Sequence, residues 1–382
     1  MTPKLARFLD SARCLESEGL ATPAILVDLD RIAANFGALR EALPDAAIYY
    51  AVKANPAAPV LDRLLGLGSR FDAASIEEIR ACLAVGAAPS AISFGNTVKK
   101  SSAIAEAFAS GVDLFAFDSD EELAKIAAAA PGAKVYCRLA VSQDGADWPL
   151  SRKFGTTGAH ARDLLITARD LGLIPHGVSF HVGSQQTGVG AYQTAIGQAA
   201  MVFSDLRARG IDLRLLNLGG GFPTRYRDDI PAIGTFGDAI MTSVRAHFGN
   251  DLPDLLIEPG RAVVADAGVA VTEVVLACTR REDSDRRWVY LDIGRFGGLA
   301  ETEGEAIKYA ITAPGLTGPD APAILAGPSC DGVDVMYRDT PYHLPASLKS
   351  GDRILIHDTG AYVTSYASQG FNGFLPPQEH YL

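Results

Sequence analysis

The 382-residue sequence contains no run of 18 or more apolar residues, so no segment is expected to cross a membrane. Residues 1–7 lack the long apolar core of a secretory signal, which favours a cytoplasmic protein. The five cysteines form no CxxC pair, so we expect neither a disulfide framework nor a metal site. The net charge of −11 argues against a nucleic-acid partner and is compatible with a cationic substrate.

Short β-type runs alternate with helix-favouring runs through the first two thirds of the chain. Eight such strand–helix units, each of roughly 25 to 35 residues, are typical of a (β/α)8 barrel, so the sequence predicts an α/β fold. The expected barrel strands are residues 24–28, 47–52, 70–74, 91–94, 114–117, 135–139, 177–182 and 213–218.

From about residue 256 the pattern changes to frequent β-branched runs with few long helical stretches between them. This change predicts a second, mostly β domain. We place the cofactor-binding barrel at residues 23–255, and the β domain at residues 1–22 and 256–382.

Lys53 ends an apolar, strand-like run in the sequence YAVKAN, residues 50–55. A lysine fixed on a rigid element can form an imine with a carbonyl cofactor, and burial shifts an amine towards its neutral, nucleophilic form. Lysines are more often solvated surface charges, so this run alone leaves both interpretations open.

Other polar residues also fall at the ends of predicted barrel strands, which in such barrels face the active site. They are Asp72, Arg138, His181 and Gly219. A lone histidine on an apolar strand is usually a hydrogen-bonded core residue. At a barrel rim, however, His181 can lie flat on a cofactor ring or transfer protons.

Two segments are suited to an anionic ligand. The glycines Gly219, Gly220 and Gly221 let backbone N–H groups converge on a phosphate without interference from Cβ atoms. The segment Glu258-Pro259-Gly260-Arg261 places a permanently charged guanidinium close to a carboxylate. Each motif alone is also typical of a plain surface turn, but together they match the phosphate site found late in many barrels.

Cys330 and Asp331 lie in a Gly/Pro-rich loop of the predicted β domain, GPSCDGVD, residues 327–334. An exposed thiol can donate a proton, while a neighbouring carboxylate pairs with a cationic substrate group. Residues 360–362, which include Tyr362, and the aromatic loop 370–374 are equally consistent with hairpin turns that carry core aromatics.

These motifs together resemble those of the eukaryotic-type ornithine/lysine decarboxylases, which belong to the alanine racemase-like (fold type III) class of pyridoxal phosphate enzymes. The resemblance runs in the same order from about residue 22 to the C-terminus. CDG rather than CES favours this branch over the diaminopimelate decarboxylases. The motifs are YAVKAN (50–55), RFDAAS (70–75), KFG (153–155), SFHVGS (179–184), LGGGFP (218–223), EPGR (258–261), GPSCDGVD (327–334), GAY (360–362) and FNGF (371–374).

The resemblance implies a pyridoxal 5'-phosphate cofactor bound covalently by Lys53. It implies that His181 stacks on the pyridine ring, that Glu258 pairs with the ring nitrogen, and that Asp72 and Arg138 support the cofactor from below. The phosphate would be surrounded by Ser184, Gly219, Gly220, Gly221, Gly260, Arg261 and Tyr362.

The resemblance further implies decarboxylation of a basic L-amino acid, with ornithine, which gives putrescine, ahead of lysine. Cys330 would return a proton to Cα, and Asp331 would bind the distal ammonium. The loop that carries both residues would complete the site of a partner subunit in a homodimer.

One departure concerns the substrate. A second carboxylate ligand expected before the CDG loop is missing, because its nearest counterpart is residues 307–310, which include Tyr309. We hypothesise that Glu301 or Glu305 substitutes, and a solvated acidic loop is the alternative.

Three rival functions stay open at this point: a diaminopimelate decarboxylase, an amino-acid racemase and an inactive regulatory homologue. Asp331 would repel the distal carboxylate of diaminopimelate, the CDG context argues against a racemase, and the retention of Lys53, Glu258, Arg261 and Cys330 argues against an inactive homologue.

Overall fold

The computed structural model describes residues 21–149, 153–281 and 285–382, so residues 1–20 of the predicted β domain lie outside the described residues. The chain divides into two compact units. The barrel unit comprises Ala33–Pro223 and Ile230–Val263. Of the described residues, the β unit comprises 21–32, Thr224–Asp229 and Val264–Leu382. The predicted domain limits were residues 22/23 and 255/256, whereas the units change at residues 32/33 and 263/264.

Eight parallel strands close the barrel in the order β10-β11-β2-β3-β4-β5-β6-β8, which confirms the predicted (β/α)8 architecture. Most of their residues are buried, as expected for parallel strands with side chains packed on both faces. Six buried side chains from five of the barrel strands form an interior cluster: Tyr49, Leu114, Ala116, Tyr136, Leu215 and Leu256. The strands are β2 (Ala46–Ala51), β3 (Arg70–Ala73), β4 (Ile92–Phe94), β5 (Leu114–Phe117), β6 (Lys134–Arg138), β8 (Ile174–Ser179), β10 (Leu215–Asn217) and β11 (Asp254–Ile257).

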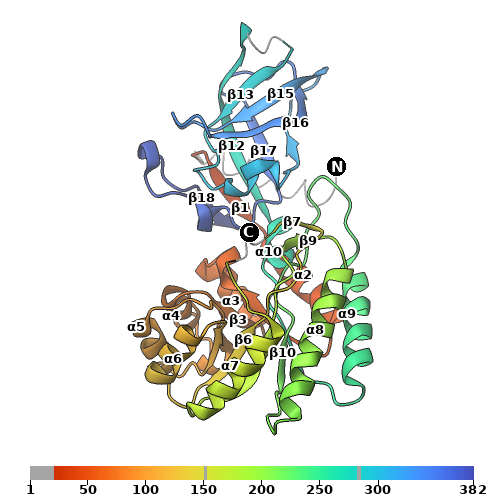
Figure 1. Ribbon diagram of the computed structural model, residues 1–382. Helices are drawn as coiled ribbons and strands as arrows, with labels where there is room; N and C mark the ends of the chain where they lie inside the picture. Colours follow the sequence, from red (N-terminus) through yellow and green to blue (C-terminus); the bar gives the residue numbers. More distant parts are fainter. Residues whose placement is uncertain (1–20, 150–152, 282–284) are drawn as a thin grey trace. The chain divides into compact units, whose positions relative to one another are not determined.

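Helices alternate with these strands and lie outside them (Figure 1). Several begin at a side-chain cap: Ser75, Ser119 and Thr157 each accept a hydrogen bond from the backbone three residues on. The helices are α2 (Leu29–Ala42), α3 (Ala58–Gly66), α4 (Ile76–Ala84), α5 (Ser101–Ala109), α6 (Asp120–Ala129), α7 (Gly158–Asp170), α8 (Gly190–Arg207), α9 (Ile233–Phe248) and α10 (Arg261–Val264).

The first predicted barrel strand was wrong. β1 (Ala24–Val27) pairs antiparallel with β12 (Gly268–Thr279) and parallel with β18 (Gln378–Tyr381), all within the β unit, and the eighth barrel strand is β11 instead. β1 is fully buried and is followed by a helix, as a barrel strand would be. Its sequence therefore carries the barrel pattern, and only its long-range pairing distinguishes it.

The second, mostly β domain is confirmed as an eight-stranded sheet with the path β14-β17-β12-β13-β15-β16. To this path β1 adds by pairing with β12, and β18 adds by pairing with β1. One cluster in this unit packs Leu26, Val269, Val271 and Leu355. The strands are β12 (Gly268–Thr279), β13 (Arg287–Leu291), β14 (Ile311–Thr312), β15 (Asp320–Ala326), β16 (Val335–Pro345), β17 (Arg353–His357) and β18 (Gln378–Tyr381).

Shorter elements complete the chain. β7 (Ala146–Trp148) and β9 (Ser184–Gln186) form a separate two-stranded sheet. The 3-10 turns are η1 (Val52–Ala54), η2 (Pro89–Ala91), η3 (Ala265–Ala267), η5 (Ala300–Glu305), η6 (Thr364–Tyr366) and η7 (Phe371–Gly373). Among the helices described, none is long and apolar enough to cross a membrane.

Candidate active site

Lys53 emerges at the carboxyl end of strand β2, in the turn η1. Its neighbours Val52 and Ala54 are buried, whereas Lys53 itself is exposed. The backbone N–H of Ala51 donates to the carbonyl of Pro259 at 3.0 Å, which fixes the end of β2 against the segment that follows β11. The turn therefore presents an amine at the barrel mouth from a backbone that is held on both sides.

Asp72 and Arg138, at the ends of β3 and β6, lie in the same electrostatic environment. Burial raises the pKa of Asp72 well above its usual value; the Glu258 carboxylate adds to the rise, while Lys53 and Arg138 oppose it. Burial also lowers the pKa of Arg138, and the negative charge of Glu258 opposes this decrease. These mutual influences place Asp72, Arg138, Glu258 and Lys53 within electrostatic range of one another in the barrel unit.

The Asp72 carboxyl is closely packed, but one of its oxygens lacks a hydrogen-bond partner among the described residues. A Cβ atom on Gly95 would lie 1.9 Å from Asp72 Oδ1, so glycine is required beside it. Oδ1 is buried and accepts no hydrogen bond from any residue that the structure describes. A buried oxygen of this kind is normally paired, so a bound group is needed to complete the site.

His181 follows β8 and is neutral at neutral pH. Burial lowers its pKa well below 6.5, and the charges of Arg138 and Lys53 lower it further. Its Nδ1 accepts a hydrogen bond from the backbone N–H of Gly183 at 3.1 Å, so the ring proton resides on Nε2. The ring is thereby fixed as an uncharged, flat surface. Both Arg138 and His181 border a cavity of about 610 Å³.

The three glycines that follow β10 form a closely packed turn. Added Cβ atoms would lie 2.0 Å from Phe180 O at Gly219, 2.6 Å from Glu258 O at Gly220 and 2.4 Å from Gly183 O at Gly221. Gly219 and Gly221 also have positive φ angles of 67° and 101°. No other residue fits this backbone, because a Cβ atom at any of the three positions would strike a neighbouring carbonyl oxygen.

The Arg261 guanidinium and the Ser184 hydroxyl are hydrogen-bonded to each other at the predicted phosphate position. The guanidinium of Arg261, which begins α10, donates to Ser184 Oγ through Nε at 3.3 Å and Nη2 at 3.0 Å. Arg261 is only 3% exposed, so its charge is directed into the site rather than into solvent. Gly260 is buried immediately before it.

Asn217, the last residue of β10, was missed by the sequence analysis. Its Nδ2 donates to Glu258 Oε1 at 2.5 Å, and its Oδ1 accepts from the Gly219 N–H at 2.9 Å. The available signal was an asparagine two residues before a strand-terminating glycine, a spacing at which asparagine side chains bond the backbone.

In the β unit, Asp334 organises the loop that carries Cys330 and Asp331. The buried Asp334 carboxylate accepts hydrogen bonds from the N–H groups of Arg295 at 2.8 Å and Ser329 at 3.1 Å. Added Cβ atoms on Gly294 or Gly327 would strike it at 2.2 Å and 2.3 Å. The sequence analysis assigned no role to Asp334.

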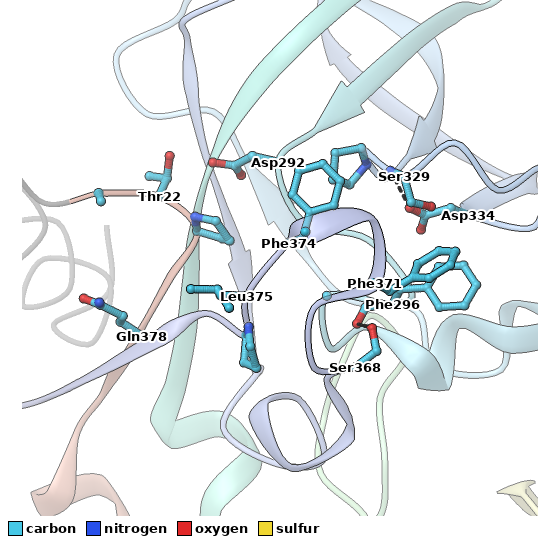
Figure 2. A pocket seen from close by; sticks show the side chains of 16 residues that line it. Thr22, Asp292, Phe296, Ser329, Asp334, Ser368, Phe371, Phe374, Leu375 and Gln378 are labelled. Carbon is cyan, nitrogen blue, oxygen red and sulfur yellow. Dashed lines mark hydrogen bonds between the residues drawn. The ribbon is translucent and has the colours of Figure 1, made fainter.

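A pocket of about 320 Å³ borders this loop, also within the β unit. Figure 2 shows the aromatic side chains Phe296, Phe371 and Phe374 around it, with Ser329 bonded to Asp334 at its side. The rings of Phe296 and Phe371 lie 4.6 Å apart. The aromatic loop 370–374 is therefore part of the surroundings of the Cys330 loop and not a distant hairpin.

Cys330 and Asp331 are both exposed. Cys330 bonds Asn372, through its backbone N–H at 3.0 Å and its thiol at 3.3 Å. Asp331 accepts a hydrogen bond from the Val333 N–H at 3.0 Å, which orients its carboxylate but leaves it accessible. Tyr362 is 9% exposed, has a φ of 56° and packs on Tyr366.

The structure gives no support to the predicted amine-binding roles of Glu301 and Tyr309, which are 1% and 0% exposed. The ring of Tyr309 packs edge-on against Tyr226, 5.4 Å away, as a core residue does. Both were selected for their position in the sequence before the CDG loop, and their burial depends on packing that this position does not reveal.

Glu305, the alternative to Glu301, has a structural role. Its carboxylate accepts the N–H groups of Arg338, Asp339 and Thr340 at 2.6 Å, 2.7 Å and 2.6 Å. Partial burial raises the pKa of Glu305, but these hydrogen bonds outweigh the effect and lower it. With its oxygens bonded to backbone N–H groups inside strand β16, where the register with β15 shifts, Glu305 is not a substrate ligand in this arrangement.

The barrel-unit residues fit pyridoxal phosphate. A buried guanidinium, a hydroxyl and a glycine turn suit its phosphate, a carboxylate suits its protonated ring nitrogen, a neutral imidazole suits its ring face, and an amine suits its aldehyde. The buried Asp72 Oδ1 adds an acceptor that needs a partner. Fold and donor set together define a barrel enzyme that uses a pyridoxal cofactor.

Comparison with known proteins gives the family. Residues 29–265 match the model of the pyridoxal-dependent decarboxylase, pyridoxal binding domain. The lysine/ornithine decarboxylase of Selenomonas ruminantium is 36% identical over 93% of this chain and 88% of its own length. Antizyme inhibitor 2 of Xenopus laevis is 34% identical over 89% of this chain and 76% of its own length.

A solved structure agrees with these sequence matches. The lysine/ornithine decarboxylase of Vibrio vulnificus, complexed with cadaverine, has a TM-score of 0.89 and 29% identity, and the match covers 100% of this chain and 99% of that one. The same protein has also been solved with putrescine. The chain belongs to the pyridoxal-dependent decarboxylase family, and it is a carboxy-lyase that uses pyridoxal 5'-phosphate.

Proposed function

We propose that this enzyme decarboxylates a basic L-amino acid, with ornithine first and lysine second, and so produces a diamine such as putrescine for polyamine biosynthesis. The observation that carries the substrate class is the accessible Asp331 carboxylate next to the Cys330 thiol, in a loop fixed by Asp334. A carboxylate beside the proton donor attracts a distal ammonium and repels a distal carboxylate. The decarboxylases of Selenomonas ruminantium and Vibrio vulnificus described above are named for lysine and ornithine.

We assign the cofactor to the barrel unit. Lys53 binds its aldehyde, Ser184, Arg261, Gly260 and residues 219–221 hold its phosphate, and Glu258 bonds its ring nitrogen. Asp72 and Arg138 would support it and His181 would cover its ring, whereas Tyr362 of the β unit stays a predicted phosphate ligand. When bound, the protonated ring withdraws electrons from Cα as CO2 leaves.

The chain's own groups then perform four tasks. Asp331 orients the substrate by its distal amine. The neutral His181 presents an uncharged ring face, so no imidazolium competes for the departing carboxylate. The Cys330 thiol supplies a proton to Cα once CO2 has left. The Lys53 amine would hold the cofactor aldehyde, and its fixed turn limits how far the amine can move.

The substrate is tested by measuring CO2 release from ornithine, lysine, arginine and meso-diaminopimelate side by side. We expect ornithine and lysine to lead and to differ modestly, because one methylene changes binding by only ~1–3 kcal/mol. A clear preference for meso-diaminopimelate would overturn the assignment. Asp331→Asn provides the matched variant, since it keeps the shape of the side chain and removes its charge.

The cofactor assignment is tested by absorbance. Wild-type protein incubated with pyridoxal phosphate should gain a visible band that borohydride abolishes, and Lys53→Ala should not form it. Lys125→Ala, which removes a lysine of the same unit outside the site, is the control and should form the band normally. A Lys53→Ala protein with an unchanged band would remove Lys53 from the proposal.

We also propose a homodimer in which the β unit of one subunit completes the site of the other. Five large apolar side chains are exposed in or near the Cys330 and aromatic loops: Val333, Tyr366, Phe371, Phe374 and Leu375. Exposed apolar side chains grouped in this way are typical of a protein interface.

Mixing Lys53→Ala and Cys330→Ala proteins tests whether the two subunits share active sites, because a mixed dimer regains one site with both groups. No recovery after subunit exchange would contradict the shared arrangement. The cytoplasmic location remains a prediction.

A further inference from the structure

Asn217 is completely buried at the end of β10, and its two polar atoms have separate partners. One partner is the Gly219 N–H of the predicted phosphate turn, and the other is the Glu258 carboxylate, the predicted partner of the ring nitrogen. The backbone strengthens this connection, because the Glu258 N–H donates to Gly219 O at 2.8 Å. Asn217 therefore joins the two ends of the cofactor site.

The orientation of the carboxamide follows from its neighbours. The Gly219 N–H can only donate, so the atom that faces it must be the oxygen. The nitrogen then necessarily faces Glu258, where an N–H group meets a carboxylate oxygen. With Oε1 occupied in this way, Oε2 is the oxygen available to the cofactor.

A second asparagine of the barrel shows which part of this geometry is ordinary. Asn96, after β4, also accepts an N–H two residues on, from Val98 at 3.1 Å, and also donates to a neighbouring strand end, at Ala74 O, 3.2 Å away. Its acceptor is a backbone carbonyl, whereas that of Asn217 is a predicted cofactor ligand. Both asparagines therefore form the same kind of turn, but only Asn217 donates a hydrogen bond to Glu258.

We propose that Asn217 is a positioning residue for the cofactor, one that sets the Glu258 carboxylate and the glycine turn in register with each other. This inference rests on the proposed role of Glu258. A charge-neutral donor is required here, because a hydrogen bond to a carboxylate stabilises its ionised form, whereas a second carboxylate would repel it.

Asn217→Asp tests the Glu258 contact with almost no change of shape. Aspartate still accepts the Gly219 N–H, but it places a second carboxylate against Glu258. We expect the dissociation constant of pyridoxal phosphate to rise about 10- to 100-fold at neutral pH, as for loss of a hydrogen bond to a charged group. The defect should shrink as the pH falls, because a proton shared by the two carboxyls restores the donor.

Asn217→Leu removes both contacts, and its defect should not depend on pH in this way. Asn96→Asp and Asn96→Leu are the matched controls, since they change the same kind of turn without touching Glu258. We expect them to leave cofactor affinity within about twofold of wild type. Unfolding midpoints of all four variants without cofactor separate loss of fold from loss of positioning.

Two results would overturn the inference: wild-type cofactor affinity in Asn217→Asp, or a defect with the same size and the same pH dependence as that of Asn96→Asp. If Asn217→Leu fails to fold, the Asn217→Asp variant alone still tests the positioning role of Asn217. Glu258→Gln separates the two levels of the argument. An unchanged cofactor affinity and absorbance in Glu258→Gln would refute the proposed role of Glu258 itself, whereas a defect there with none in Asn217→Asp would refute only the positioning role.

Discussion

The carboxamide oxygen of Asn372 accepts hydrogen bonds from both the backbone N–H and the thiol of Cys330, at 3.0 Å and 3.3 Å. One oxygen thus fixes the backbone and the direction of the thiol together. Asn372 has a φ of 52°, a region that favours asparagine and glycine over other residues. The FNGF motif therefore holds the proposed proton donor, which connects two motifs that lie 42 residues apart in the sequence.

Asn372→Gly should lower turnover about 5- to 10-fold while changing the Michaelis constant little. Glycine keeps the left-handed backbone without strain, so the variant removes only hydrogen bonds worth about 1 kcal/mol. Steady-state kinetics measure the effect, and the alkylation rate of Cys330 in the same protein reports the released thiol independently of catalysis. Wild-type turnover in this variant would contradict the positioning of the thiol.

Replacement by asparagine should affect substrate binding at Asp331 and folding stability at Asp334. Asp331→Asn removes an accessible charge, so the Michaelis constant for ornithine should rise roughly 10- to 100-fold with no change in the unfolding midpoint. Asp334→Asn turns an N–H group towards a buried N–H donor, so the free energy of unfolding should fall by about 1–3 kcal/mol. Steady-state kinetics and thermal unfolding of both variants measure these effects. Equal changes in the Michaelis constant and in the unfolding midpoint for the two variants would contradict the separate roles of Asp331 and Asp334.

The barrel could be predicted because its signal is local. Each strand is a short apolar run followed by a helix, and catalytic side chains occupy the positions where such runs end. Lys53, Asp72, Arg138 and His181 are predicted by that rule, and Asp72 and His181 both feel the charges of Lys53 and Arg138. β1 was misplaced because it satisfies the same local pattern while its partners lie more than 200 residues away.

What escaped prediction depends on non-local packing. Asn217 and Asp334 are ordinary polar residues in sequence, and only their burial and partners reveal what they hold. Glu301 and Tyr309 illustrate the converse, because residues chosen from a motif position are buried here. Residue type and spacing predict which chemistry is present, whereas burial decides which residue can take part.

Gly219→Ala should damage the site far more than Gly210→Ala, although both glycines have similar φ angles of 67° and 74°. At Gly210 no atom lies within 4 Å of an added Cβ, so only the backbone strain of about 1–2 kcal/mol is expected. At Gly219 the Cβ would also meet Phe180 O at 2.0 Å, which forces the turn to move. We expect at least about a tenfold loss of pyridoxal phosphate affinity for Gly219→Ala alone. Equal affinities in the two variants would remove the argument from close approach.

A buried lysine outside the site should make stability depend on pH. The Lys99 side chain is fully buried, pairs with Glu122 at 3.0 Å and donates to the carbonyls of Asn96 and Ala116. Burial lowers the pKa of Lys99 from 10.5 to about 8, although Glu122 opposes the shift. Between these two pH values the unfolded chain keeps a proton that the folded chain has lost.

Stability contributed by a group rises with pH wherever the unfolded state binds more protons. The penalty from Lys99 is therefore full below its folded pKa of about 8 and disappears as the pH approaches 10.5. Relative to Lys99→Met, the wild type should gain free energy of unfolding through this window, by at most about 1.4 kcal/mol per pH unit. Denaturant unfolding across the window measures the difference. Lys125→Met is the control, because Lys125 pairs with the same Glu122 but is partly exposed, so this variant should retain the wild-type rise. A difference between wild type and Lys99→Met that stays constant with pH would show that Lys99 does not lose its proton in the folded protein.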